Sequence, residues 1–469
     1  MKLKPIATIM LGYAINVAST QTTFASEDFS APPAKSYSIS KHMHQDYGAH
    51  WLTPRLLTLS PDASVIKSIN KSGQLFLAKR QEGNVQLLAK LSAIDETPDI
   101  DKNFPHLANF HRFQLAISNE TAKELAKHPL VIVSLYNNQI TGVSSVQTGN
   151  LLDSLYTAGR QDADEDSDYG ATVVGSKTYF KLWAPTARSV KVLLFNKAKE
   201  AISQPLPMVQ DMHTGSWQTQ ASNLPPHLFY QYQITLYHPE SLKIDTITTT
   251  DPYSLSLSTN SEYSQIVDLA NKATYPEGWE KQQDHAITQA TDNIFYELHI
   301  GDFSASDTSI SDTSLRGKYA AFSQTGSNGI KHLKLLRDAG INTLHLLPSF
   351  DIGTINEQKD EAITLNDTLS SICQRAPRIS FCQSTIADDI AKNFTLEQLL
   401  AQQDPMTSDA QRIVSELRAI DNYNWGYDPF HYTVPEGSYA TEPDGISRIV
   451  EFRKMVMNMH NLGFRVVMD

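Results

Sequence analysis

Short apolar runs separated by polar turns follow residue 50. Runs of this length, bounded by polar clusters, predict β-strands rather than helices. Residues 121–127 have the pattern of one short helix. The strand candidates are residues 56–59, 75–78, 85–91 and 130–135. The pattern predicts a small β-rich domain over residues 50–157, in which no motif indicates a catalytic or binding site.

A second block of alternating apolar and polar positions covers residues 171–285. Strand spacing of this kind, with turn residues between the strands, favours a β-sandwich. Trp183 and Trp217 fall within this block. Each is either a platform on which a sugar ring stacks or a residue of the hydrophobic core, and the core is at least as well supported. The strand patterns lie at residues 179–185, 189–195 and 229–234.

An acidic stretch, residues 158–170, separates the two β-rich blocks. Alternating acids are typical of calcium loops, but this spacing lacks the central glycine and the terminal glutamate of an EF-hand loop. We therefore predict a solvated linker. Its acids are Asp162, Asp164, Glu165, Asp166 and Asp168.

The pattern of apolar and polar positions changes in residues 286–469. A strand pattern at residues 293–300 leads into a helical pattern capped by Gly340, and an apolar strand follows. The same order returns downstream, where Gly463 caps a helical face and a strand at residues 464–468 ends before Asp469. Alternation of strands and helices predicts βαβ units in a parallel sheet. The long insertion between its second strand and residue 445 is typical of a loop elaborated for function.

Composition and charge narrow the function classes. The chain has 469 residues, enough for about three domains. Its 51 acidic and 39 basic residues give a formal net charge of −12, which argues against nucleic acid or an anionic membrane as the main partner. No internal stretch is long and apolar enough to span a bilayer. A neutral polymer is compatible with this balance.

The first residues have the pattern of an export signal. Lys2 and Lys4 precede a moderately apolar segment at residues 6–18, and residues 23–25, Thr-Phe-Ala, can precede a cleavage site. We predict a signal peptide at residues 1–25 and a flexible lead-in at residues 26–49, and hence a secreted or periplasmic protein. An ordinary disordered N-terminus is the alternative.

The two cysteines, Cys373 and Cys382, lie close together in one polar loop. In an exported chain this spacing predicts a local disulfide. A zinc site needs more ligands, and no histidine lies between them. Two free thiols remain the alternative for a cytosolic chain.

Residues 423–429, Tyr-Asn-Trp-Gly-Tyr-Asp-Pro, combine three aromatic rings, one acid and two backbone breakers. A rigid loop of this kind either stacks on sugar rings or packs as an aromatic turn on a core. These seven residues resemble the signature of type I pullulanases, starch-debranching enzymes of glycoside hydrolase family 13. Residues 180–186 and 250–253 resemble the two ends of a family-48 carbohydrate-binding module. Residues 431–439 continue the pullulanase pattern, and residues 463–469 resemble the third barrel strand.

This resemblance implies a multidomain fold, in which β-rich domains precede the first part of a (β/α)₈ barrel at residues 286–469. It also implies retaining hydrolysis of α-1,6-glucosidic bonds in pullulan, starch or glycogen, through two carboxyl groups about 5 Å apart. The family carries these groups at the fourth and fifth strands. We therefore assign no catalytic residue before Asp469, and expect a truncated sequence or an N-terminal fragment that is inactive alone.

The resemblance carries over three substrate-binding residues. Tyr427 corresponds to the residue that stacks on the sugar at the cleavage subsite, and Asp428 is expected to hydrogen-bond in or near it. Trp425 either lines the site or supports the loop from behind, and we favour support. Glu297, Asp302 and Asp351 are interpreted as structural or loop acids. No cofactor is required, although related enzymes often carry calcium.

Two alternatives stay open. One is an isoamylase-like or branching relative, although such enzymes generally lack the whole Asn-Trp-Gly-Tyr-Asp-Pro string. The other is a non-catalytic α-glucan-binding fragment that uses the family-48 module. The residues encoded beyond Asp469 discriminate between the alternatives.

Overall fold

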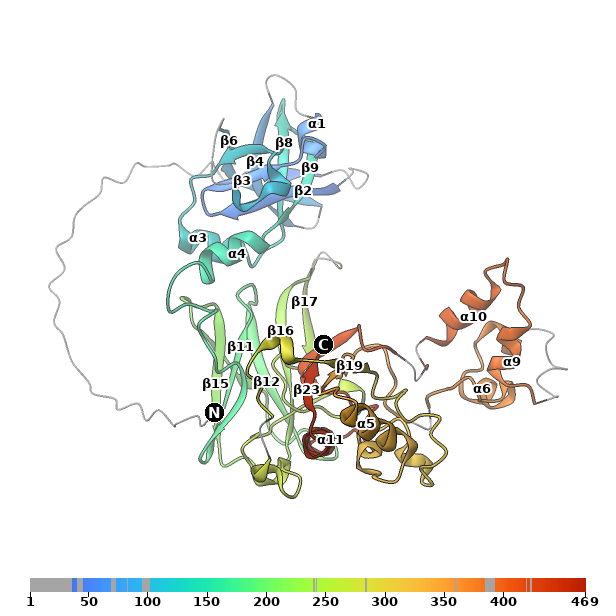
Figure 1. Ribbon diagram of the computed structural model, residues 1–469. Coiled ribbons are helices and arrows are strands. Elements are labelled where there is room, and N and C mark those ends of the chain that lie inside the picture. Colours follow the sequence, from blue (N-terminus) through green and yellow to red (C-terminus); the bar gives the residue numbers. More distant parts are fainter. Residues whose placement is uncertain are drawn as a thin grey trace.

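The computed structural model describes most of the chain as two β domains followed by a mixed region of parallel strands and helices (Figure 1). The predicted signal peptide lies outside the described residues, as does most of the predicted lead-in. The described residues are 36–39, 45–68, 73–81, 83–94, 102–238, 241, 243–282, 285–358, 361–383, 393–418, 420–421 and 424–469.

The N-terminal domain is built on one nine-stranded sheet of order β1-β5-β4-β8-β9-β2-β3-β7-β6. All pairings are antiparallel except that of β2 with β9. Trp51, Leu57 and Ile132 are fully buried between the sheet and its short helices. The strands are β1 (Ser36–Ser38), β2 (Gln45–Thr53), β3 (Leu56–Leu59), β4 (Gln74–Gln81), β5 (Asn84–Lys90), β6 (Ser92–Ala93), β7 (His111–Gln114), β8 (Leu130–Tyr136) and β9 (Gln139–Gln147). The helices are α1 (Ser64–Ser68), α3 (Asn119–Leu125) and α4 (Gly149–Tyr156).

The predicted lead-in is wrong where the structure describes it. Residues 36–38 form β1 and pair with β5, and β2 begins at residue 45. The strand predictions for residues 56–59, 75–78, 85–91 and 130–135 correspond to β3, β4, β5 and β8.

The second domain is a sandwich of two antiparallel sheets (Figure 1). One has the order β10-β11-β15-β14, and the other has the order β13-β12-β16-β17, with β18 paired to β16. Trp217 is 7% exposed and donates from Nε1 to the carbonyl of Ala184 at 2.9 Å, so it is a core residue rather than a sugar platform. The strands are β10 (Gly170–Val174), β11 (Lys177–Trp183), β12 (Ser189–Phe195), β13 (Leu206–Pro207), β14 (Val209–Gln210), β15 (Ser216–Ser222), β16 (Phe229–His238), β17 (Lys243–Thr249) and β18 (Ser264–Gln265).

The C-terminal region confirms the predicted alternation. Strands β19 (Phe295–Leu298), β20 (Thr343–Leu346) and β23 (Arg465–Met468) form a parallel sheet, connected by α5 (Asn328–Asp338) and α11 (Ser447–Asn461). Gly340 and Gly463 follow the two helices with φ of +105° and +92°, the left-handed geometry expected of helix C-caps. The predicted fold class is confirmed: β-rich domains precede the first β/α units of a barrel.

The long insertion divides into a small sheet and a helical part. Strands β21 (Phe350–Ile352) and β22 (Pro429–Pro435) pair antiparallel beside the barrel strands. Between them, helices with their own apolar core project away from the rest of the molecule (Figure 1). These are α6 (Leu369–Arg375), α7 (Ser380–Gln383), α9 (Leu396–Ala401) and α10 (Asp409–Leu417). Cys373 and Cys382 are joined by a disulfide, but they lie on α6 and α7 rather than in the predicted polar loop.

Candidate functional site

The loop at residues 424–429 is held in a tight turn. Gly426 has φ of +92°, and a Cβ there would lie 2.4 Å from the carbonyl oxygen of Pro348, so only glycine fits. The Gly426 amide donates to Oδ1 of Asn424 at 2.7 Å, which closes the turn. Tyr423, the first residue of the predicted motif, lies outside the described residues.

This loop contacts the C-terminal ends of all three parallel strands. His299, just after β19, contacts the Asn424 carbonyl through Nε2 at 3.0 Å. Pro348 follows β20 and lies against Gly426. The Tyr427 hydroxyl donates to Oδ2 of Asp469, just after β23, at 2.7 Å. The carboxyl ends of the strands are where barrel enzymes carry their sites.

The aromatic rings of the loop face outward. Trp425 is 59% exposed and Tyr427 is 57% exposed. More than half of Trp425 is uncovered by the described residues, and the role expected of it, lining the site or supporting the loop from behind, stays a prediction. The hydrogen bond to Asp469 raises the pKa of the Tyr427 hydroxyl above its usual range, so this group stays neutral.

Asp428 is fixed beside these rings as a carboxylate. Its Oδ2 accepts from the Thr354 hydroxyl at 2.9 Å and from the Asn424 amide at 3.2 Å. These two bonds, that of Thr354 first, lower the pKa of Asp428. An ionised carboxylate accepts hydrogen bonds from sugar hydroxyls but has no proton to give to a leaving group. Asp428 therefore suits substrate binding and not acid catalysis.

A buried ionic cluster lies beneath the loop, between β21, β22 and α11. Arg448 is fully buried, with Nη1 3.4 Å from Oδ1 of Asp351 and Nη2 3.0 Å from Oε2 of Glu357. His431 contacts Oδ2 of Asp351 through Nδ1 at 2.7 Å. Glu436 is also fully buried and accepts backbone N–H bonds at both oxygens, from Ile352 and Ser438, each at 2.6 Å.

The cluster also joins the second domain to the barrel strands. The Ser261 hydroxyl donates to Asp351 at 2.5 Å, and the Asn260 amide donates to Glu357 at 2.6 Å. Thr250 contacts Nε2 of His431 at 2.9 Å. Sequence reasoning identified Asp351 only as a structural acid and missed the others, because no local pattern links residues so far apart.

The cluster does not offer a metal site. One oxygen from each of Asp351, Glu357 and Glu436 lies within 4.8 Å of the others, an arrangement that suits a cation. The guanidinium of Arg448 already supplies the positive charge there. Among the other acids considered, Glu297 contacts Nδ1 of His345 at 3.1 Å and Asp302 is more than half exposed.

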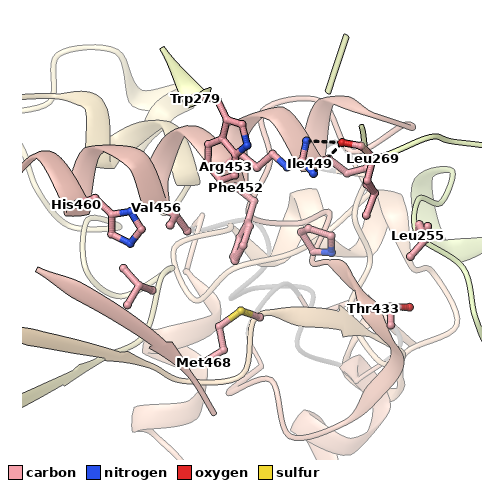
Figure 2. Close-up of a pocket in the computed structure, with 12 residues that line it drawn as sticks. Leu255, Leu269, Trp279, Thr433, Ile449, Phe452, Arg453, Val456, His460 and Met468 are labelled. Carbon is pink, nitrogen blue, oxygen red and sulfur yellow. Dashed lines mark hydrogen bonds between the residues drawn. The ribbon is translucent and has the colours of Figure 1, made fainter. Parts of the chain in front are cut away.

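An apolar groove of about 400 Å³ lies between α11, β22 and β23. Figure 2 shows Phe452 and Val456 of α11 and Met468 of β23 around it, with Arg453 bonded to the Leu269 carbonyl at 3.2 Å. Its lining is mostly aliphatic and aromatic, with few polar groups to meet sugar hydroxyls. We therefore assign the candidate site to the loop at residues 424–429 instead.

Two family models match the β domains. Residues 168–254 match carbohydrate-binding module 48, the isoamylase N-terminal domain, and residues 46–154 match the pullulanase N2 domain. The two matched domains precede the parallel β/α units in the chain. This order defines the class of protein, in which a carbohydrate-binding module is joined to the beginning of a barrel.

Curated proteins similar to this chain include pullulanases. A pullulanase of Klebsiella pneumoniae is 34% identical over 432 residues, which is 90% of this chain and 39% of the relative. Pullulanase 1, chloroplastic, of Arabidopsis thaliana is 29% identical over 90% of this chain and 40% of its own length. The structure of the Klebsiella pneumoniae pullulanase complexed with maltotriose superposes with a TM-score of 0.78 at 33% identity, over 92% of this chain and 41% of that one.

The resemblance to pullulanases is therefore confirmed over nine-tenths of the chain. The chain spans about two fifths of the length of these relatives.

Proposed function

We propose that this chain is the substrate-positioning part of a starch-debranching glycoside hydrolase that cleaves α-1,6-glucosidic bonds with retention of configuration. The observation that carries the proposal is the loop at residues 424–429, which presents exposed Tyr427 and Trp425 rings at the carboxyl ends of the barrel strands. The pullulanase relatives give the reaction class.

Three residues of the loop have distinct roles in this proposal. The Tyr427 ring stacks on the apolar face of a glucose unit, and its hydroxyl is held by Asp469. Asp428 accepts hydrogen bonds from sugar hydroxyls. Trp425, exposed beside them, lines the same subsite. The nucleophile and the acid/base belong to parts of the protein outside these 469 residues, so the chain alone binds α-glucan without hydrolysing it.

Calorimetric measurement of maltotriose binding to the full chain tests the assignment. Replacing Tyr427 with alanine is expected to weaken binding about tenfold, because loss of one stacking ring costs roughly 1–1.5 kcal/mol. Tyr47→Ala is the matched control, since Tyr47 is 64% exposed on β2 of the N-terminal domain. Equal affinity in wild type and Tyr427→Ala removes the stacking role.

Hydrolysis separates the enzyme from a simple glucan-binding protein. In the complete enzyme, Tyr427→Ala is expected to lower the turnover of pullulan at least tenfold without changing the circular dichroism spectrum. The 469-residue chain is expected to release no reducing ends from pullulan. Release by the chain alone places the catalytic groups inside it, whereas a complete protein that binds but never cleaves supports the non-catalytic alternative.

Export is part of the proposal. Residues 1–25 carry the pattern of a signal peptide. Within the described residues, no helix has the length and apolar character that a membrane span requires. N-terminal sequencing of the mature protein, recovered outside the cytoplasm, is the direct test.

A further inference from the structure

A group of acids lies where the two β domains meet. The segment between α4 of the N-terminal domain and β10 of the second domain contains Asp162, Asp164 and Glu165. One carboxylate oxygen from each lies within 4.8 Å of the other two. Three like charges at this separation repel one another unless something positive lies between them.

Asp162 departs from the solvated linker that the sequence predicts, whereas Asp164, Glu165 and Asp168 in the same segment are exposed. Asp162 is 6% exposed, and its Oδ2 accepts from the Gly159 amide at 2.6 Å. Its Oδ1 is buried and has no hydrogen-bond partner. A buried carboxylate oxygen without a donor is costly, which makes it an indicator of a missing ligand.

The basic side chains nearby are engaged elsewhere. Lys181 Nζ lies 2.8 Å from both Oδ2 of Asp166 and Oδ1 of Asp168, the other acids of the segment. Within the described ranges, no lysine or arginine forms an ion pair with Asp162, Asp164 or Glu165. His213 faces the segment, and its Nε2 lies 3.2 Å from the Gln161 carbonyl.

The backbone around the acids is fixed by both domains. The Ala163 amide donates to the carbonyl of Tyr156, the last residue of α4, at 2.9 Å. The Tyr169 hydroxyl donates to the Ala163 carbonyl at 2.9 Å and contacts the hydroxyl of Ser216 on β15 at the same distance. The Asp162 amide donates to Glu165 at 3.2 Å. The carboxylates are thus arranged in advance, and ordering them costs little on binding.

We propose that Asp162, Asp164 and Glu165 bind a divalent cation of the calcium type at the junction of the two β domains. Carboxylate oxygens are hard ligands, and calcium accepts six to eight oxygens in flexible geometry, so water completes the shell on the exposed side. Magnesium, which demands a near-ideal octahedron of short bonds, fits such a shell less well. The ion joins α4 to the β10 side of the junction. This site does not depend on the proposed glucan function.

Calorimetric titration of the chelator-treated full chain with calcium chloride alone tests the site. Wild type is expected to bind one more equivalent of calcium than a variant carrying Asp164→Asn with Glu165→Gln, and Asp164→Asn alone is expected to weaken this site at least tenfold. Asp168→Asn is the matched control, since Asp168 belongs to the same segment but pairs with Lys181. Asp164 and Glu165 are exposed, so the variants should fold.

Hydrogen exchange of residues 158–168 gives a second readout. Calcium is expected to slow exchange in wild type and Asp168→Asn but not in Asp164→Asn. Absence of calcium binding in the millimolar range overturns the proposal and leaves a shared proton between Asp162 and Asp164 as the explanation of their contact. Equal stoichiometry and affinity in wild type and in the Asp164→Asn variants overturns it too, because the ion then binds elsewhere.

Discussion

The exposed loop at residues 424–429 and the ionic cluster around Arg448 lie at the same end of the barrel strands, yet they differ in nearly every physical respect. The loop holds its acid, Asp428, with a hydroxyl and an amide near solvent. The cluster holds Asp351, Glu357 and Glu436 around one fully buried guanidinium. Exposed aromatic rings and an ionised acid suit reversible contact with a sugar. A buried, fully bonded network instead fixes the backbone that carries the loop.

This contrast assigns different consequences to acids of the same type. Loss of a loop residue is expected to change binding and leave stability intact. Loss of a cluster residue is expected to change stability first, because buried charges left without a partner are costly. The following changes test that division, beginning with the largest effect.

Replacing Arg448 with methionine is expected to destabilise the protein by about 3–5 kcal/mol, because it leaves buried carboxylates without their cation. Urea unfolding followed by circular dichroism measures this as a lower transition midpoint. Arg412→Met is the control, since Arg412 is about half exposed and pairs with the surface acids Asp409 and Glu416. Equal midpoints for the two variants contradict the idea that the cluster holds the two domains together.

The pH dependence of stability tests the same cluster. Burial, with the charge of Glu357 next, raises the pKa of Glu436 from 4.5 to about 8. The folded state therefore binds this proton more tightly than the unfolded chain. The stability from Glu436 is fully present below pH 4.5 and is lost as the pH rises towards 8. Between these values the free energy of unfolding is expected to fall by up to about 1.4 kcal/mol per pH unit.

The Glu436→Gln variant provides the comparison, because glutamine does not titrate. Its absolute stability changes, since Ile352 and Ser438 both donate to the carboxylate. The informative quantity is the slope of unfolding free energy against pH, which is expected to be shallower in the variant. Superimposable slopes between pH 5 and 8 rule out Glu436 as the titrating group.

The smallest effect is expected from Tyr427→Phe, which keeps the ring and removes only the hydroxyl bonded to Asp469. Maltotriose affinity should fall by no more than about threefold, since one exposed hydrogen bond contributes roughly 0.5 kcal/mol. Measured beside Tyr427→Ala, it separates stacking from positioning. A loss as large as that of the alanine variant assigns the main role to the hydroxyl instead of the ring.

Local patterns predicted the parts of the fold that local physics controls. Short apolar runs identified β3, β4 and β8, alternation identified β12, and helical spacing with Gly340 and Gly463 identified the two barrel helices. The strand β9 and the helix α4 were missed, because their apolar positions are diluted by glycine, serine and polar residues. The helices of the insertion were missed for a related reason, since they pack mainly against one another in a small core.

The candidate site was predicted in part. The composition of residues 424–429 indicated a rigid aromatic loop, and the structure places Tyr427, Asp428 and Trp425 together at its surface. No local pattern indicates the hydrogen bond between Tyr427 and Asp469, which are 42 positions apart. Nor does any local pattern distinguish Asp162, buried at a domain junction, from the solvated acids beside it.

By itself the sequence determined the alternation of strands and helices in the barrel region, the glycines that end its two helices, and the signature that relates the chain to pullulanases. Only the tertiary structure decided which acids are buried around Arg448, which lie exposed beside Tyr427, and which meet where the two β domains join. The physical reason is that periodicity and turn chemistry act over a few neighbouring residues. Burial and charge pairing instead depend on segments that folding brings together, such as Asn260 and Ser261 against Glu357 and Asp351.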